Sequence, residues 1–141
     1  MSADDTKVVI GVDLGDRWSQ LFILHRKTGE IEERRIQTTP EALQRVFCQY
    51  DPARVALEVS THSPWVSRLL EGLGHEVVIA NARMVGLIHG DRKKDDRTDA
   101  EKLCLLADYN PELLAPITHR SAEAQAEVAV LRARDALVGT R

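Results

Sequence analysis

Acidic residues stand in two apolar segments of this chain, where carboxylates are costly unless they have a task. Asp13 lies within the segment KVVIGVDL (7–14), and Glu58 lies near the end of RVALEV (54–59). A buried, unpaired carboxylate is unfavourable in a strand, so each residue is a candidate ligand of a metal or substrate. A turn or capping role for Asp13, and a solvent-facing side chain for Glu58, are the ordinary alternatives.

A second acidic pair, Asp96 and Asp99, opens a segment (96–109) whose composition predicts a helix. The two residues are three apart and share a helix face. At about 100° per residue that face coincides with the apolar stripe, which predicts that both point toward the sheet and that Asp95 lies at its edge. The stripe consists of Ala100, Leu103, Leu106 and Ala107. The alternative is that acidic residues simply favour helix N-termini.

Together these four carboxylates predict a metal centre. Four converging carboxylates cannot all stay ionised without a cation. Hard oxygen ligands suit Mg²⁺ or Mn²⁺ rather than zinc. Two such ions, about 3.5–4 Å apart, activate a nucleophile and stabilise the leaving oxygen in phosphoryl transfer. The acidic set therefore predicts phosphoryl-transfer chemistry.

The segments around these residues predict an α/β fold that brings strand ends together. Expected strands cover 7–14, 18–25, 30–37, 54–59 and 75–80, and expected helices begin at Pro40, at Ser63, at Asp96 and at Ser121. The short turns between the first three strands indicate an antiparallel meander. Strand–helix alternation in the second half indicates parallel strands. The prediction is a five-stranded mixed sheet flanked by helices, with functional groups at the carboxyl ends of its strands.

Three motifs, GVDLG (11–15), LEVS (57–60) and KKDDRTDA (93–100), resemble those of the DEDD-type insertion-sequence transposases, relatives of the Piv DNA invertase. The resemblance covers essentially the whole chain and implies an N-terminal RuvC-like domain on the RNase H fold. The family's acidic tetrad falls on Asp13, Glu58, Asp96 and Asp99, because its last two members are written D-x-x-D-A. Asp95 occupies a position that is often Thr in relatives.

The resemblance also implies a function and partners. The full-length proteins are recombinases that cleave and transfer DNA strands with two Mg²⁺ or Mn²⁺ ions, guided by a structured RNA. Their C-terminal domain carries a serine that acts with the tetrad. We expect residues 1–120 to form the metal-binding domain, and residues 121–141 to start a helix or coiled coil leading to that domain and forming a homo-oligomer. Alone, this chain is expected not to complete recombination.

The overall composition is that of a soluble globular domain. The 141 residues carry a net charge of −3 and a pI near 5.9, which is not the signature of a nucleic-acid binder. An acidic metal site explains part of this balance. With no apolar run that could span a membrane and no signal peptide at the N-terminus, a cytoplasmic protein is expected. Cys48 and Cys104 are expected to be two buried thiols.

Several other residues have two interpretations. The basic residues near the acidic helix contact phosphates or simply form a solvated loop; they are Arg83, Arg92, Lys93, Lys94 and Arg97. Trp18 and Trp65 could stack on bases, although a core position is the more common role. No pair of histidines has metal-ligand spacing, and Ser19 and Ser63 have no visible triad.

Three rival functions stay open at this stage. GVDLG followed by a hairpin also opens the actin-like and sugar-kinase ATPases, but that fold needs two such halves, and ATP binding would discriminate. A stand-alone Holliday-junction resolvase of the same superfamily would cleave branched DNA without help. A non-catalytic nucleic-acid or dimerisation module with a decayed site would tolerate Ala at all four acidic positions.

Overall fold

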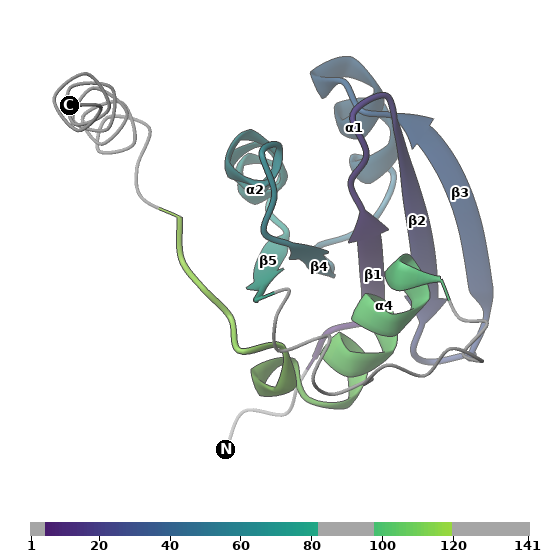
Figure 1. Ribbon diagram of the computed structural model, residues 1–141. Coiled ribbons are helices and arrows are strands. Elements are labelled where there is room, and N and C mark those ends of the chain that lie inside the picture. Colours follow the sequence, from purple (N-terminus) through teal and green to yellow (C-terminus); the bar gives the residue numbers. More distant parts are fainter. Residues whose placement is uncertain (1–4, 82–97, 120–141) are drawn as a thin grey trace, which may run out of the picture.

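A computed structural model describes residues 5–81 and 98–119 of the chain, and its core is a five-stranded sheet (Figure 1). The strand order is β3-β2-β1-β4-β5. The strands are β1 (Val8–Asp13), β2 (Trp18–His25), β3 (Ile31–Gln37), β4 (Arg54–Glu58) and β5 (Glu76–Ala80). β1, β2 and β3 are antiparallel neighbours, whereas β4 runs parallel to both β1 and β5. The predicted mixed sheet and its meander are therefore confirmed.

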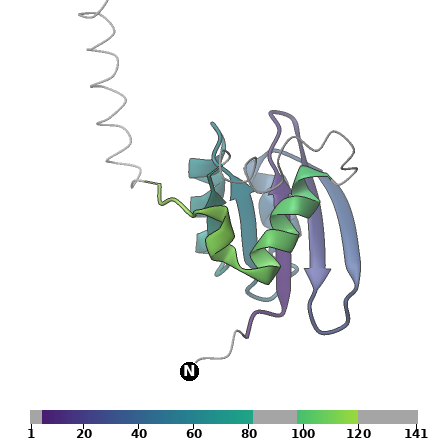
Figure 2. The same cartoon turned by 60° about the horizontal axis from the view of Figure 1, so that its bottom comes forward.

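Helices cover both faces of the sheet. One face packs against α1 (Pro40–Phe47) and α2 (Ser63–Gly72), and the other packs against α4 (Asp99–Tyr109), as Figures 1 and 2 show. A short 3₁₀ helix, η1 (Pro111–Leu114), follows α4, and Ile117 then bridges to Ile79 at the outer edge of β5. Among the described residues, no helix is long and apolar enough to cross a membrane.

Local signals in the sequence fix most element boundaries. The predicted start of α1 at Pro40 is confirmed, and the side chain of Thr39 caps the helix by accepting a hydrogen bond from the Ala42 amide. Gly29 and Gly74 have φ values of +79° and +95°, which suit the turns they occupy. The predicted start of the helix 96–109 was wrong: Thr98 caps this helix, α4, and Asp99 is its first residue.

α4 lies directly on the backbone of β1. A Cβ atom built at Gly11 would stand 1.9 Å from the Ala100 carbonyl oxygen and 2.6 Å from the Cys104 amide nitrogen. The Cys104 thiol also donates a hydrogen bond to the Val9 carbonyl oxygen at 3.3 Å. Because Gly11 lacks a side chain, the helix approaches the strand more closely than any other residue type would allow. This contact fixes where the first turn of α4 stands relative to the end of β1.

Only one of the two cysteines is buried, although burial was predicted for both. Cys104 is buried in the α4 face of the core, as predicted, whereas Cys48 is exposed at the C-cap of α1. The Cys48 prediction failed because the apolar stripe of α1 ends at Phe47. A residue just beyond the last helical turn does not follow the periodicity that buries its neighbours.

Candidate metal centre

Asp13 and Glu58 end two neighbouring parallel strands. In the register of β1 and β4, Val12 lies beside Leu57, so the next residue of each strand is an acid. Each acid also lies on the α4 side of the sheet, because Gly11 and Ala56, two residues earlier, contact that layer. The sequence prediction that these two carboxylates meet at the carboxyl edge of the sheet is consistent with this placement. Asp13 is not inside the strand, however: it is the last residue of β1 and is exposed.

Asp99 reaches the same edge from above the sheet. It is the first residue of α4, whose second residue, Ala100, lies against Gly11. The expectation that Asp99 belongs to the buried stripe was wrong, because it is exposed and the buried side chains of α4 are Ala100, Leu103, Cys104 and Ala107. At the helix N-terminus, its carboxylate is stabilised by the helix dipole.

Neighbouring negative charges act on the carboxyl groups of Glu58 and Asp13. Burial raises the pKa of the Glu58 carboxyl, and the charges of Asp99 and Asp13 raise it further. Although Asp13 as a residue is exposed, partial burial of its carboxyl group raises its pKa, and the charge of Asp99 adds to the shift. A like-charge neighbour disfavours ionisation, so both shifts report negative charges held close together.

No compensating cation accompanies these three acids within the part of the chain that the structure describes. The side chains of Asp13, Glu58 and Asp99 form no hydrogen bond or ion pair with another described residue. Nor do three acidic, His or Cys side chains among the described residues already lie close enough to hold a metal ion. The donor set nevertheless fits Mg²⁺ or Mn²⁺, because it is all oxygen and lacks a cationic partner.

The remaining predicted site residues lie outside the described part of the chain. They are Asp96, the fourth predicted acid, and the basic residues Arg83, Arg92, Lys93, Lys94 and Arg97. The boundary expected near residues 120 and 121 lies there too. The structure thus brings together three of the four predicted carboxylates.

A series of hydrogen bonds between three side chains, near the acids, was not predicted from the sequence. The Trp65 indole N–H donates to Nδ1 of His62 at 3.1 Å, and Nε2 of His62 lies 3.1 Å from the Asp16 carboxylate. An indole nitrogen only donates, so Nδ1 is the acceptor and Nε2 carries the proton that Asp16 accepts. This series ties the loop after β1 to the loop after β4. Sequence analysis missed it because the partners are far apart along the chain.

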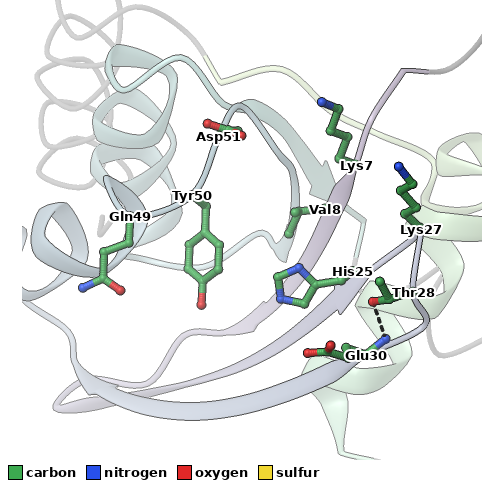
Figure 3. A pocket seen from close by; sticks show the side chains of 9 residues that line it. All are labelled: Lys7, Val8, His25, Lys27, Thr28, Glu30, Gln49, Tyr50 and Asp51. Carbon is green, nitrogen blue, oxygen red and sulfur yellow. Dashed lines mark hydrogen bonds between the residues drawn. The ribbon is translucent and has the colours of Figure 1, made fainter.

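A cavity of about 480 Å³ lies at the opposite edge of the sheet, away from the acids (Figure 3). Lys7 and Val8 at the start of β1 line it, together with His25 and Tyr50, whose rings are 6.3 Å apart. The His25 ring also lies 2.6 Å from the Glu32 carboxylate. Its two lysines, Lys7 and Lys27, are matched by Glu30 and Asp51 in the same lining. This cavity therefore has no clear charge preference and no carboxylate cluster, and it is not the candidate centre.

Comparison with solved structures shows the fold. The structure of T. thermophilus RuvC in complex with a Holliday junction substrate has a TM-score of 0.51 and 14% identity, covering 74% of this chain and 96% of RuvC. A second Thermus thermophilus RuvC structure gives 0.51 and 16% over the same shares. The chain therefore has a RuvC-like fold of the RNase H type. An inorganic polyphosphate/ATP-glucomannokinase from Arthrobacter sp. strain KM gives 0.37 and 22%, over 58% of this chain and 47% of the kinase, which is too weak a likeness to bear on the fold.

Comparison of the sequence with protein families gives a single identification. No curated protein matches the chain. The model of the IS110-type DEDD transposases, described as a transposase, matches residues 10–141. That span includes the strands and the helix that carry the three acids, and it covers nearly all of the chain. The chain therefore belongs to the IS110-type family of DEDD transposases.

Proposed function

We propose that this chain is the metal-binding domain with which an insertion-sequence transposase cleaves and transfers DNA strands. One observation carries the proposal: Asp13, Glu58 and Asp99 come from β1, β4 and α4 to one edge of the sheet, where burial and neighbouring negative charge raise the pKa of Asp13 and of Glu58. Unpaired like charges at this density destabilise a fold, and a divalent cation removes that cost.

The chain's own residues then have distinct tasks. Asp13 and Glu58, at adjacent strand ends, would hold a cation from the sheet, and Asp99 would hold it from the helix side. We propose Asp96, which lies outside the described residues, as the fourth ligand. Bound Mg²⁺ or Mn²⁺ supplies an activated nucleophile and stabilises charge on the leaving oxygen. Gly11 contributes by letting α4 approach the sheet, which sets the spacing between Asp99 and the strand acids.

The experiment that tests this proposal is Mn²⁺ binding, measured by calorimetry and by anomalous diffraction from soaked crystals. We expect one or two Mn²⁺ peaks about 2.0–2.3 Å from the oxygens of Asp13, Glu58 and Asp99. Asp13→Asn and Glu58→Gln should each weaken binding at least about tenfold, in line with the loss of a ligating group. Asp51→Asn, at the opposite edge, is the matched control and should bind normally. Equal binding by all variants would refute the centre.

The partners follow as proposals from the same site. DNA is the expected substrate, and a structured guide RNA and a homo-oligomer formed through residues 121–141 are proposed for the full-length protein. Strand transfer by this chain alone is not expected, because the proposed serine lies in a further domain. Joining of donor and target DNA by the 141-residue chain without that domain would contradict this division of labour.

A resolvase-type nuclease is the second candidate, because the structures most similar in fold include RuvC with a Holliday junction. Under that reading the isolated chain cuts branched DNA in Mg²⁺. Under the transposase reading it does not. A cleavage assay with four-way junctions, using Asp13→Asn as the inactive control, separates the two.

A further inference from the structure

A row of polar side chains continues from the acids across the sheet. In the register of β1, β2 and β3, Asp13 lies beside Gln20, and Gln20 lies beside Arg35. Directly paired residues of neighbouring strands project from the same face, so the row lies on the α4 face of the sheet. At about 4.8 Å per strand, Arg35 is about 10 Å from Asp13. About three nucleotides of a single strand, at about 3.4 Å each, cover that distance.

Trp18 lies beside this row, nearer the edge of the sheet at which β1 ends. It precedes Gln20 by two residues on β2 and therefore shares its face. The expectation of a core position for Trp18 was wrong, since Trp18 is 46% exposed. The guanidinium of Arg35 stands 4.9 Å from the centre of the Trp18 ring. The cation–π contact holds the arginine in place while nearly half of the tryptophan surface stays open.

A hollow of about 440 Å³ adjoins the Trp18 ring. The residues that line it are Asp16, Arg17, Trp18, Gln37, Thr38 and Thr39. Arg17 is exposed in the β1–β2 loop. The Thr38 amide donates a hydrogen bond to the Arg17 carbonyl oxygen at 2.9 Å, which joins this loop to the end of β3. One arginine, one carboxylate, amide and hydroxyl groups and one open aromatic ring thus surround the hollow, and Arg35 stands against that ring.

We infer that Trp18, Arg35 and Arg17 form a binding surface for the unpaired DNA strand next to the phosphodiester held at the acids. This inference rests on the proposed function and names where its substrate continues. An open aromatic ring stacks on any base, and flanking arginines neutralise phosphates, which is how single strands are bound without sequence readout. A rigid duplex offers no free base face to the Trp18 ring, so the surface favours a melted strand.

The acidic groups nearby do not cancel this surface. Asp16 accepts from His62 at 3.1 Å, which engages its charge. Glu33, two residues before Arg35 on β3, faces the same side and lies next to Phe22, one step farther from the acids. The positive end of the row therefore lies at Arg35 and Arg17, on the side nearest the carboxyl edge.

The test compares two arginines that are neighbours in sequence but lie on opposite faces of β3. Arg35→Gln removes a charge from the Trp18 face. Arg34→Gln removes the same charge from the other face, where Arg34 donates to the Gln49 side chain. Binding of a fluorescent oligothymidine to the 141-residue chain is measured by anisotropy in Mg²⁺ over a range of salt. Trp18→Ala and Trp18→Phe report on stacking, and circular dichroism checks that each variant is folded.

We expect Arg35→Gln to weaken binding and to make the negative slope of log affinity against log salt shallower by about 0.7, the value for one phosphate contact on a single strand. Arg34→Gln should leave that slope unchanged. Trp18→Ala should weaken binding about 5- to 150-fold, the range for losing one base–aromatic stack. Oligothymidine should quench the fluorescence of the wild-type chain, and the quenching should disappear in Trp18→Phe, which retains only Trp65.

Equal effects of the two arginine variants, or unchanged quenching in Trp18→Phe, would overturn the inference. So would tighter binding of a blunt duplex than of the single strand. These outcomes are independent of the Mn²⁺ experiment: a chain that binds Mn²⁺ at the acids but no oligothymidine loses this surface and keeps the metal centre. Conversely, quenching at Trp18 without Mn²⁺ binding leaves a strand-binding module and removes the metal centre.

Discussion

Asp13 illustrates at the residue scale how a binding site costs stability. Its pKa is raised by burial and then by Asp99, so the folded chain holds the Asp13 proton more readily than the unfolded chain does. The sign follows from linkage: a raised folded-state pKa makes the ionised group destabilising at neutral pH, and this cost disappears as the pH falls toward the ordinary value of 3.8. We therefore predict that Asp13→Asn raises the Tm of the metal-free chain at pH 7.

Measuring that Tm as a function of pH gives the control. The advantage of Asp13→Asn over wild type should shrink between neutral pH and about pH 4, because the wild-type carboxyl becomes protonated. Asp51→Asn, at an exposed turn by the opposite edge of the sheet from Asp13, Glu58 and Asp99, should show no such pH-dependent advantage. A variant that is less stable than wild type at pH 7 would mean that Asp13 has a stabilising partner and is not a repelled charge.

At the scale of elements, the contact between α4 and β1 decides where Asp99 stands. Gly11→Ala puts a methyl group 1.9 Å from the Ala100 carbonyl oxygen, a backbone atom that cannot rotate away. We predict that this variant loses about 1–3 kcal/mol of stability or more, as overpacked sites do, and that any folded fraction binds Mn²⁺ weakly because α4 is displaced. Urea unfolding and calorimetry measure both effects.

Gly72→Ala is the matched control for this substitution. Gly72 is the last residue of α2, and nothing lies within 4 Å of a Cβ atom built there. Alanine should therefore be neutral or stabilising by up to about 1 kcal/mol. If both alanine variants had the same stability, the close approach of α4 to the sheet would not be the cause of the loss at Gly11.

Two arginines hold the other end of α4. Arg54, which is 7% exposed, donates from its guanidinium to the Ala107 carbonyl oxygen at 3.1 Å and to Glu76 at 3.2 Å. Arg26 donates to the Asp108 carboxylate at 2.7 Å and to the Asp108 carbonyl oxygen at 3.2 Å. Positive charges at a helix C-terminus offset its dipole and satisfy its free carbonyls. α4 is thus fixed at both ends of its path across the sheet.

We predict that Arg54→Met destabilises the chain by about 1.5–3 kcal/mol, the cost of losing a hydrogen bond to a charged group in a buried setting. Arg26→Met should cost less, because its side chain is 26% exposed and solvent screens the lost pair. Chemical denaturation of the two variants measures the difference. A larger loss of stability for Arg26→Met than for Arg54→Met would mean that the more exposed Arg26 contributes more to holding α4 in place than the buried Arg54 does.

The elements were predicted from sequence to different degrees, for reasons that local chemistry explains. Strand alternation and the Thr39–Pro40 pair were sufficient for β2 and for the start of α1, because both signals lie within the segments themselves. The start of α4 was placed three residues too early, since Asp96 and Thr98 both look like helix starts and only the Thr98 hydrogen bond to the Glu101 amide decides between them. Arg26 and Arg54 gave no local signal, because their partners are 82 and 53 residues away.

At the scale of the whole molecule, metal binding and folding are linked. If the cation binds only the folded chain, Mn²⁺ at 100 times its Kd should add about 2.7 kcal/mol to the free energy of unfolding. The increase should be absent in Asp13→Asn, so the order of stability of the two proteins should reverse between metal-free and Mn²⁺ solutions. Thermal unfolding with and without Mn²⁺ measures this reversal, and parallel increases in both proteins would place the ion elsewhere.

The site was only partly predictable for the same reason that the fold was. Asp13 and Glu58 were identifiable because an acid after an apolar strand is conspicuous in one dimension. Their mutual distance, and the open ring of Trp18 beside Arg35, depend on strand register, which residue types alone do not reveal. The acidic pair and the motif resemblance both indicated Asp99, although helix periodicity placed it in a buried stripe and the residue is exposed.

The parallel pairing of β1 with β4 has a consequence for the order of events during folding. The meander β1–β2–β3 joins neighbours in sequence and can form early, but of the three acids of the candidate centre it contains only Asp13. Glu58 arrives only when β4 crosses over to β1, and Asp99 only when α4 docks on Gly11. Such non-local closures are slow steps, because loop entropy opposes them. A nascent or misfolded chain therefore carries these three acids apart from one another, so that the proposed metal centre is assembled only in the completed fold.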